Sequence, residues 1–122
     1  MPILHVASPK LDMETKDQIA AKAYECIVRV LELPPVHRVK IYFDECDSIY
    51  ENGKVLDEIQ LDITFDGPIL IPEKIDALSK GLYEIATSAI KKKLNVIFSH
   101  RGSEFDHVSV DGVLISDIIK GN

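Results

Sequence analysis

Apolar residues recur along the chain with two different periods, and the changes between them mark out the expected secondary structure. Residues 2–6 form a short apolar segment that begins at Pro2, and proline suits the first residue of a strand because it has no N–H to donate. After a turn over 8–12, apolar side chains recur at helical spacing over 19–31, with charged residues on the opposite face. The pattern therefore predicts a strand and then an amphipathic helix with Asp12 as its N-cap.

The next segments complete a β-α-β unit and add a hairpin. A Pro-Pro pair at 34–35 should end the helix, and residues 36–43 (VHRVKIYF) are rich in the β-branched and aromatic side chains that favour strands. Residues 44–56 form a polar excursion, in which the Asn-Gly pair at 52–53 predicts a tight two-residue turn.

A second unit follows the same order. Residues 59–65 (IQLDITF) alternate between apolar and polar, which is the period of a strand with one buried face, and the Gly-Pro pair at 67–68 should end it. Pro72 suits the first turn of a second helix, whose apolar stripe runs over 75–90. Residues 94–99 (LNVIFS) predict the fourth main strand.

The C-terminal region predicts another hairpin. Beyond a loop at 100–104, the segments 105–110 and 113–115 flank an Asp-Gly pair at 111–112, a strong signal for a two-residue turn. Each β-α-β unit is therefore followed by a short hairpin.

Together the two units predict an α+β fold with a mostly four-stranded sheet, two helices on one face and short hairpins. We expect a single domain, 1–122, with pseudo-repeats at about 2–56 and 57–115, because shifting one half by 56 residues superposes several apolar positions. These positions are Ile3 on Ile59, Ile19 on Ile75, Ile41 on Ile97 and Tyr42 on Phe98. A ferredoxin-like fold has the same element order and stays open, since periodicity does not say which strands are neighbours.

Composition and charge narrow the classes of function. The chain has 122 residues, of which 46% are hydrophobic and 28% charged, as in ordinary soluble globular domains, and no apolar run has the length of a membrane span. A net charge of -6 argues against nucleic acid, which needs a basic face, and the longest basic run, 91–93, should close the second helix. Cys26 and Cys46 are too far apart for a CxxC motif, and no secretory signal precedes them, so we expect a cytoplasmic protein.

Pro2 is the first candidate for chemistry. Removal of Met1 would turn its ring nitrogen into a secondary amine, and in a dry pocket the charged form would be disfavoured, bringing the pKa toward neutrality, where general bases work best. The alternative is that Pro2 only begins a strand. If Met1 is retained, the nitrogen is an amide and cannot act as a base.

A resemblance rests on Pro2 opening a strand, the amphipathic helix, the proline turn, VHRVKIYFDE at 36–45 and YENG at 50–53. This order resembles the tautomerase superfamily, which includes 4-oxalocrotonate tautomerase and macrophage migration inhibitory factor. The doubled β-α-β length resembles the trimeric branch of the latter. The closing pattern, NVIF at 95–98 followed by a hairpin, is similar to an uncharacterised bacterial and archaeal branch, the DUF1904-like proteins.

The resemblance implies roles for particular residues. Pro2 would be the general base, and Lys40 stands where the shorter tautomerases have an arginine that binds the substrate's carboxylate or carbonyl; lysine keeps the charge but loses the bidentate fork. Tyr50 matches an aromatic residue that lines their pocket, and Lys10 lies near another family arginine. Arg38 is a further candidate for substrate binding. The alternative is that Lys40 and Arg38 are solvated on a strand and that Tyr50 only covers its hairpin.

Other polar groups have simpler explanations. The acidic residues of the segment 44–51 match no calcium-loop spacing, so we expect no metal and no cofactor. Cys46 has no histidine partner at a recognisable spacing, which argues against a catalytic thiol. His5 and His37 are expected to be structural. His100 and Arg101 follow a strand end, where ligand contacts are common in parallel sheets.

Two functions follow from the sequence. The first is a cofactor-independent tautomerase or isomerase that moves a proton on a small α-keto or 2-hydroxy-enoate acid. The second is a non-catalytic oligomeric binding or structural protein of the same fold. We expect a homotrimer in either case, because Ile115, Ile118 and Ile119 leave an apolar C-terminal edge and the resemblance sets the number of chains. A pocket should lie where Pro2 meets a neighbouring subunit.

Overall fold

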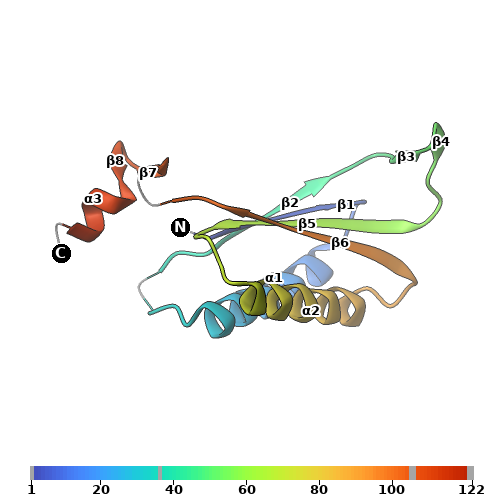
Figure 1. Cartoon of the computed structure of the whole chain (residues 1–122). Helices are drawn as coiled ribbons and strands as arrows, with labels where there is room; N and C mark the ends of the chain where they lie inside the picture. The colour runs from blue at the N-terminus through green and yellow to red at the C-terminus, as the bar shows by residue number, and fades with distance from the viewer. Residues whose placement is uncertain (1, 36, 105–106, 121–122) are drawn as a thin grey trace.

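A computed structural model describes residues 2–35, 37–104 and 107–120. Eight strands and three helices follow one another along these residues (Figure 1). In chain order they are β1 (Ile3–Ser8), α1 (Met13–Leu31), β2 (Lys40–Glu45), β3 (Tyr50–Glu51), β4 (Lys54–Val55), β5 (Ile59–Gly67), α2 (Pro72–Ala89), β6 (Leu94–Gly102), β7 (Ser109–Val110), β8 (Val113–Leu114) and α3 (Ile115–Lys120).

The four long strands form one mixed sheet in the order β2-β1-β5-β6. β1 and β2 are parallel, β5 and β6 are parallel, and the two pairs meet antiparallel at the centre. Helices α1 and α2 lie side by side on one face of this sheet (Figure 1). The predicted α+β fold is therefore confirmed. The ferredoxin-like alternative is wrong, because a split β-α-β unit would place another strand between the two strands of each unit.

The core lies between the sheet and the two helices. Alternate residues of the central strands are fully buried on this face, including Leu4, Leu61 and Phe65, and burying such side chains contributes about 1.5–3 kcal/mol each. The helices complete the core with Ile19, Ala23, Cys26, Ile27, Leu78, Leu82, Ala86 and Ile90. None of the described helices covers the middle of the opposite face, so its side chains are half-buried or exposed.

Local signals in the sequence account for the element boundaries. The side chain of Asp12 accepts a hydrogen bond from Thr15 N at 2.7 Å, and this bond lowers the carboxyl pKa. Pro72 occupies the first turn of α2. The turns at 52–53 and 111–112 both have two residues with positive φ, as type I′ hairpins require. The predicted caps and hairpin turns are confirmed.

The predicted second and fourth strands have different limits in the structure. β2 begins at Lys40, because His37 N donates to Pro34 O at 3.1 Å and the chain turns there; Val36 lies outside the described residues. β6 continues to Gly102, since it pairs with β5 along its full length. The expected loop at 100–104 is thus wrong for residues 100–102, which lie in the strand.

The C-terminal region also departs from the expectation. Only 109–110 forms the first strand of the hairpin; Phe105 and Asp106 lie outside the described residues. Residues 115–120 form a short helix that is not predicted from the sequence, and Ile118 and Ile119 on it are 40% and 53% exposed. The basic run 91–93 follows α2 and does not lie in its last turn.

Candidate functional site

Strand pairing brings four residues into one row across the sheet, at the end where β1 begins. Lys40 on β2 is opposite Ile3 on β1, Ile3 is opposite Asp66 on β5, and Asp66 is opposite Arg101 on β6. Each belongs to the set of alternating residues that faces away from the helices. Pro2 precedes the row directly, is buried, and accepts a hydrogen bond through its carbonyl from Lys40 N at 3.2 Å.

The two cations of this row differ in their partners. Arg101 holds Asp66 with two hydrogen bonds, Nε to Oδ1 at 2.7 Å and Nη2 to Oδ2 at 3.0 Å, and this bidentate geometry fixes both side chains. Among the described residues, Lys40 has no carboxylate within ion-pair distance. Its ammonium group is therefore free to meet an anionic ligand.

A histidine connects the row to the next one. His5 stacks on Tyr42, with ring centroids 5.1 Å apart. Its Nε2 lies 3.6 Å from Asp66 Oδ2, and its Nδ1 lies 3.7 Å from Asp44 Oδ2. Both distances exceed a direct hydrogen bond, so His5 lies between two carboxylates without bonding directly to either.

A small cavity of about 220 Å³ opens beside this row. Its lining residues are Ile3, Asp66, Gly67, Pro68, Ser103, Val108 and Ile115. The chain after β6 and the second hairpin form its far walls, held by the hydrogen bonds from Ser103 N to Gly67 O and from Ile115 N to Val108 O, both 2.8 Å. The lining is mainly apolar, with Asp66 as its charged group.

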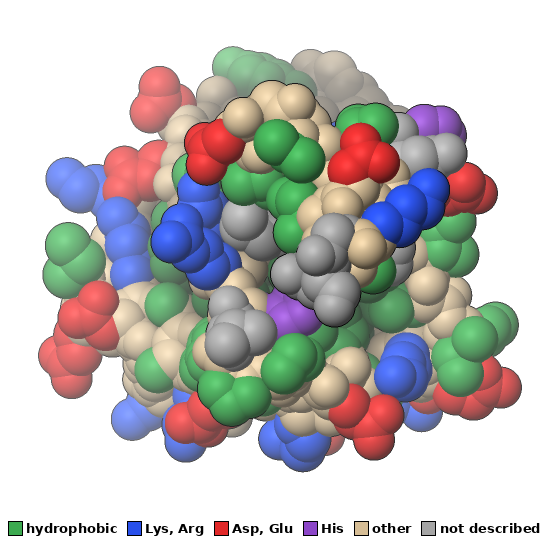
Figure 2. Space-filling view, turned by 90° about the vertical axis from the view of Figure 1, so that its left-hand side faces the viewer, with side chains coloured by type: hydrophobic (Ala, Val, Ile, Leu, Met, Phe, Trp, Pro, Cys, Tyr) green, Lys and Arg blue, Asp and Glu red, His purple; other side chains and the backbone are tan. Residues whose placement is uncertain are grey.

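The surface around this end is rich in exposed apolar side chains. Figure 2 looks onto it and shows hydrophobic side chains mixed with charged ones around a histidine. Large apolar residues come from the segment between β5 and α2 and from the C-terminal region: Ile69, Ile71, Val113, Leu114, Ile118 and Ile119. Such a concentration is typical of a surface that another molecule covers.

The site residues expected from sequence divide between the two ends of the sheet. Pro2, Arg38 and Lys40 lie at the end where β1 and β2 begin. Lys10 and Tyr50 lie beyond the ends of these parallel strands, about 20 Å away at the rise of a strand, and both are exposed. Within one chain, Lys10 and Tyr50 therefore do not share a pocket with Pro2.

Asp66 is a candidate that is not predicted from the sequence. In the alternating segment 59–65 the polar residues simply mark the solvent face, and nothing distinguishes Asp66 beyond its place before Gly67. Asp66 becomes a candidate because the pairing of β1 with β5 places it beside Ile3. The extension of β6 then supplies Arg101 as its partner. Predicting the last strand over 94–102 would have placed Arg101 in the sheet and so indicated a partner for an acidic residue of the neighbouring strand.

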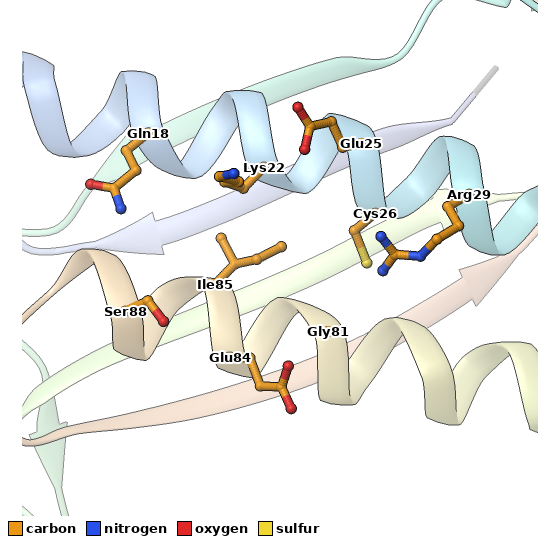
Figure 3. Close-up of a pocket in the computed structure, with 9 residues that line it drawn as sticks. All are labelled: Gln18, Lys22, Glu25, Cys26, Arg29, Gly81, Glu84, Ile85 and Ser88. Carbon is orange, nitrogen blue, oxygen red and sulfur yellow. The ribbon is translucent and has the colours of Figure 1, made fainter.

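A larger cavity, about 350 Å³, lies between α1 and α2 (Figure 3). Its rim is charged, with Lys22, Arg29 and Glu84 among the lining residues, and Cys26 points into the space between the helices. Burial raises the pKa of the Cys26 thiol, which argues against a reactive thiolate. The two helices pack closely beside this cavity. A Cβ added at Gly81 of α2 would lie 2.7 Å from Cys26 Sγ of α1.

The described part of the chain has neither a cluster of metal-ligating side chains nor a helix fit to cross a membrane. No group of three or more histidine, cysteine, aspartate or glutamate side chains is arranged to hold a metal ion there. In the same residues, none of the helices combines the length and the apolar character that a bilayer crossing requires.

Comparisons with known proteins give matches in structure only. No protein-family model matches the chain, and no curated protein matches it. A structure of Pt0534 inactivated by 2-oxo-3-pentynoate matches with a TM-score of 0.81 and 14% identity, covering 95% of this chain and 98% of that one. The wild-type fused 4-OT, an asymmetric trimer, matches with a TM-score of 0.78 and 16% identity, with the same coverage. A domain of unknown function (DUF1904) from Sebaldella termitidis matches with a TM-score of 0.69 and 20% identity, covering 93% and 99%.

Proposed function

We propose that this chain, which has the fold of the tautomerase superfamily, is a cofactor-independent tautomerase or isomerase of small α-keto or 2-hydroxy-enoate acids. Pro2 would be the general base once Met1 has been removed. One observation carries the proposal: Pro2 is buried at the head of β1, next to a strand that supplies the unpaired cation Lys40. A base and a cation beside a small apolar cavity are the groups that proton transfer on a carboxylic acid requires.

The reaction moves one proton and leaves the composition of the substrate unchanged. The Pro2 amine takes the proton from the hydroxyl group of a 2-hydroxy-enoate, and the resulting ammonium returns a proton to the carbon end of the enolate. The Lys40 ammonium attracts the substrate's carboxylate and the negative charge that develops on the oxygen. Arg38, exposed two residues before Lys40, adds positive charge along the same approach.

A second copy of the chain would complete the site. Lys10 and Tyr50 lie at the far end of the sheet, so they can meet Pro2 only from another subunit. A cyclic assembly brings one end of each chain against the other end of the next. The fused 4-OT with the same fold is a trimer, which supports a homotrimer here. In such a pocket Tyr50 would exclude water and Lys10 would add a second cation.

Covalent labelling tests the role of Pro2. The reagent is 2-oxo-3-pentynoate, which inactivates Pt0534; a free secondary amine can add to its conjugated triple bond, forming an N–C bond while a proton goes to the neighbouring carbon. The untagged protein is first weighed intact to establish that Met1 is absent. It should then gain the mass of one reagent molecule per chain at Pro2 and lose activity at the same rate.

The matched control is a chain with one residue added before Pro2, in which the nitrogen is an amide. It should not be labelled at Pro2 and should lack activity in an enol-to-keto absorbance assay. Pro2→Ala keeps a primary amine in a similar position, so its activity should fall without vanishing. Equal turnover by the native and extended proteins would rule out Pro2 as the base, and absence of turnover in the native protein would favour the non-catalytic binding protein.

A further inference from the structure

We infer that Asp66 determines the specificity of the site at Pro2, by making the adjacent cavity accept an uncharged apolar group of the ligand and reject a second carboxylate. The inference rests on the proposed function and narrows its substrate class to monocarboxylic keto or enol acids with an aromatic or alkyl substituent. It follows from the shape of the cavity and from the way in which Arg101 is already occupied.

The size and lining of the cavity suit a small apolar group. Its volume of about 220 Å³ exceeds the ~150 Å³ at which an apolar cavity holds a benzene molecule. Ile3, Pro68, Val108 and Ile115 form apolar walls. The hydrogen bond from Ser103 N to Gly67 O ties the chain after β6 to the end of β5, and the one from Ile115 N to Val108 O closes the second hairpin on itself.

Asp66 presents an acceptor-only surface to this cavity. An ionised carboxylate has no proton to donate, so it cannot bond to another carboxylate. An arginine can bind a carboxylate with two parallel N–H groups, and the Nε and Nη2 edge of Arg101 is already bound to Asp66 in this way. The second carboxylate of a dicarboxylic ligand would therefore be repelled by Asp66 in this cavity, whereas a neutral ring would contact the apolar walls.

The order of residues along the row also determines how a bound ligand is oriented across the sheet. Lys40 lies on one side of Ile3 and Asp66 on the other. The lysine and the carboxylate that lines the cavity are therefore separated by two strand spacings, about 10 Å. This separation matches the length of a small aryl keto acid. Its carboxylate would lie toward β2, and its substituent would lie toward β5 and the second hairpin.

Equilibrium binding of two unreactive probes tests the inference by calorimetry. Phenylacetate carries one carboxylate and a ring, and 4-carboxyphenylacetate adds a second carboxylate at the far end of that ring. Unaltered protein should bind phenylacetate about tenfold more tightly than the dicarboxylate, as expected for one like-charge contact near a protein surface.

Variants of the two partners of the ion pair should act in opposite directions. Asp66→Asn removes the negative charge and frees Arg101, so affinity for the dicarboxylate should rise about tenfold, while affinity for phenylacetate changes less than about twofold. Arg101→Gln leaves Asp66 unpaired and should weaken dicarboxylate binding further. Asp62→Asn is the matched control, because Asp62 lies on the same strand and face but away from the cavity.

Several results would overturn the inference. These are equal effects of Asp66→Asn and Asp62→Asn, an unchanged ratio of the two affinities in Asp66→Asn, or binding of neither probe. Thermal unfolding by circular dichroism shows whether each variant is folded, and Arg101→Gln provides a second test if Asp66→Asn is not. The probes undergo no proton transfer, so this result is separate from that of Pro2 labelling.

Discussion

The two β-α-β units each end in a type I′ hairpin, yet the two hairpins are placed differently. The hairpin β3–β4 follows β2, and all its residues from 50 to 55 are exposed, so it projects from the end of the sheet (Figure 1). The hairpin β7–β8 follows β6, and the residues that flank it, Val108 and Ile115, line the cavity beside Ile3. The residues beside the second hairpin line a cavity of their own chain, whereas the first hairpin is exposed to solvent.

This difference indicates how a site is completed. The end with Pro2 has the proposed base, a lysine without an ion-pair partner among the described residues and a small cavity, while the end with Tyr50 has an aromatic side chain that is 68% exposed and lies outside the core. An exposed tyrosine at a hairpin tip is suited to insertion into a neighbour, because its ring supplies large contact area at a low cost in side-chain entropy. We propose that the first hairpin of one chain covers the Pro2 site of the next.

Among substitutions that leave the Pro2 nitrogen unaltered, the largest effect is expected at Lys40, on the Pro2 end. Lys40→Met should lower kcat/KM about 100-fold or more, since it removes the cation that stabilises the developing enolate oxygen. Lys40→Arg should retain most of the activity, because the charge remains. The comparison variant is Arg38→Met, with an effect below about tenfold; an equal loss in both variants would mean that general positive charge, and not Lys40, is what matters.

A smaller effect is expected at the opposite end of the sheet. Tyr50→Ala should raise KM about tenfold if the hairpin covers a neighbour's site, while Tyr50→Phe should be close to unaltered protein because the role is to exclude water. The KM of each variant is measured by steady-state kinetics at protein concentrations at which the chains are assembled and at concentrations at which they dissociate. Unchanged kinetics in Tyr50→Ala would mean that the projecting hairpin has no part in the site.

The smallest effect on activity is expected in the helical layer. Gly81→Ala should destabilise the protein by about 1–3 kcal/mol in chemical denaturation, because the new Cβ meets Cys26 Sγ at 2.7 Å, and should leave kcat/KM unchanged. Combining it with Cys26→Ala should remove most of that added cost, since the crowded sulfur is gone. A large change in kcat/KM would connect the cavity between the helices to function.

Much of the fold follows from local signals that do not depend on tertiary contacts. Asp12 before an amphipathic run, Pro72 at a helix start and the Asn-Gly and Asp-Gly pairs each favour one local conformation, so the two long helices and the hairpin turns are predicted correctly. The limits of β2 and β6 are not, because they depend on pairing: β6 extends to Gly102 only because β5 continues beside it.

The candidate site is predictable only in part for the same reason. Pro2 and Lys40 are found from position and resemblance, and the structure gives them a shared backbone hydrogen bond. Asp66 and Arg101 are far apart in sequence, and their ion pair exists because of strand register, which periodicity does not determine. The short α3 is also missed, since its few residues carry too little helical pattern.

Subunit complementation tests most directly whether the two ends of the sheet form one site. One chain carries an extra residue before Pro2, and the other carries Lys10→Ala with Tyr50→Ala; each alone should have little activity. After the chains are mixed, unfolded and refolded together, about a quarter of the sites in random trimers should combine an intact Pro2 with an intact hairpin. Recovery of about that fraction of native activity is the predicted result, and a mixture no more active than the sum of its separate components would contradict a shared site.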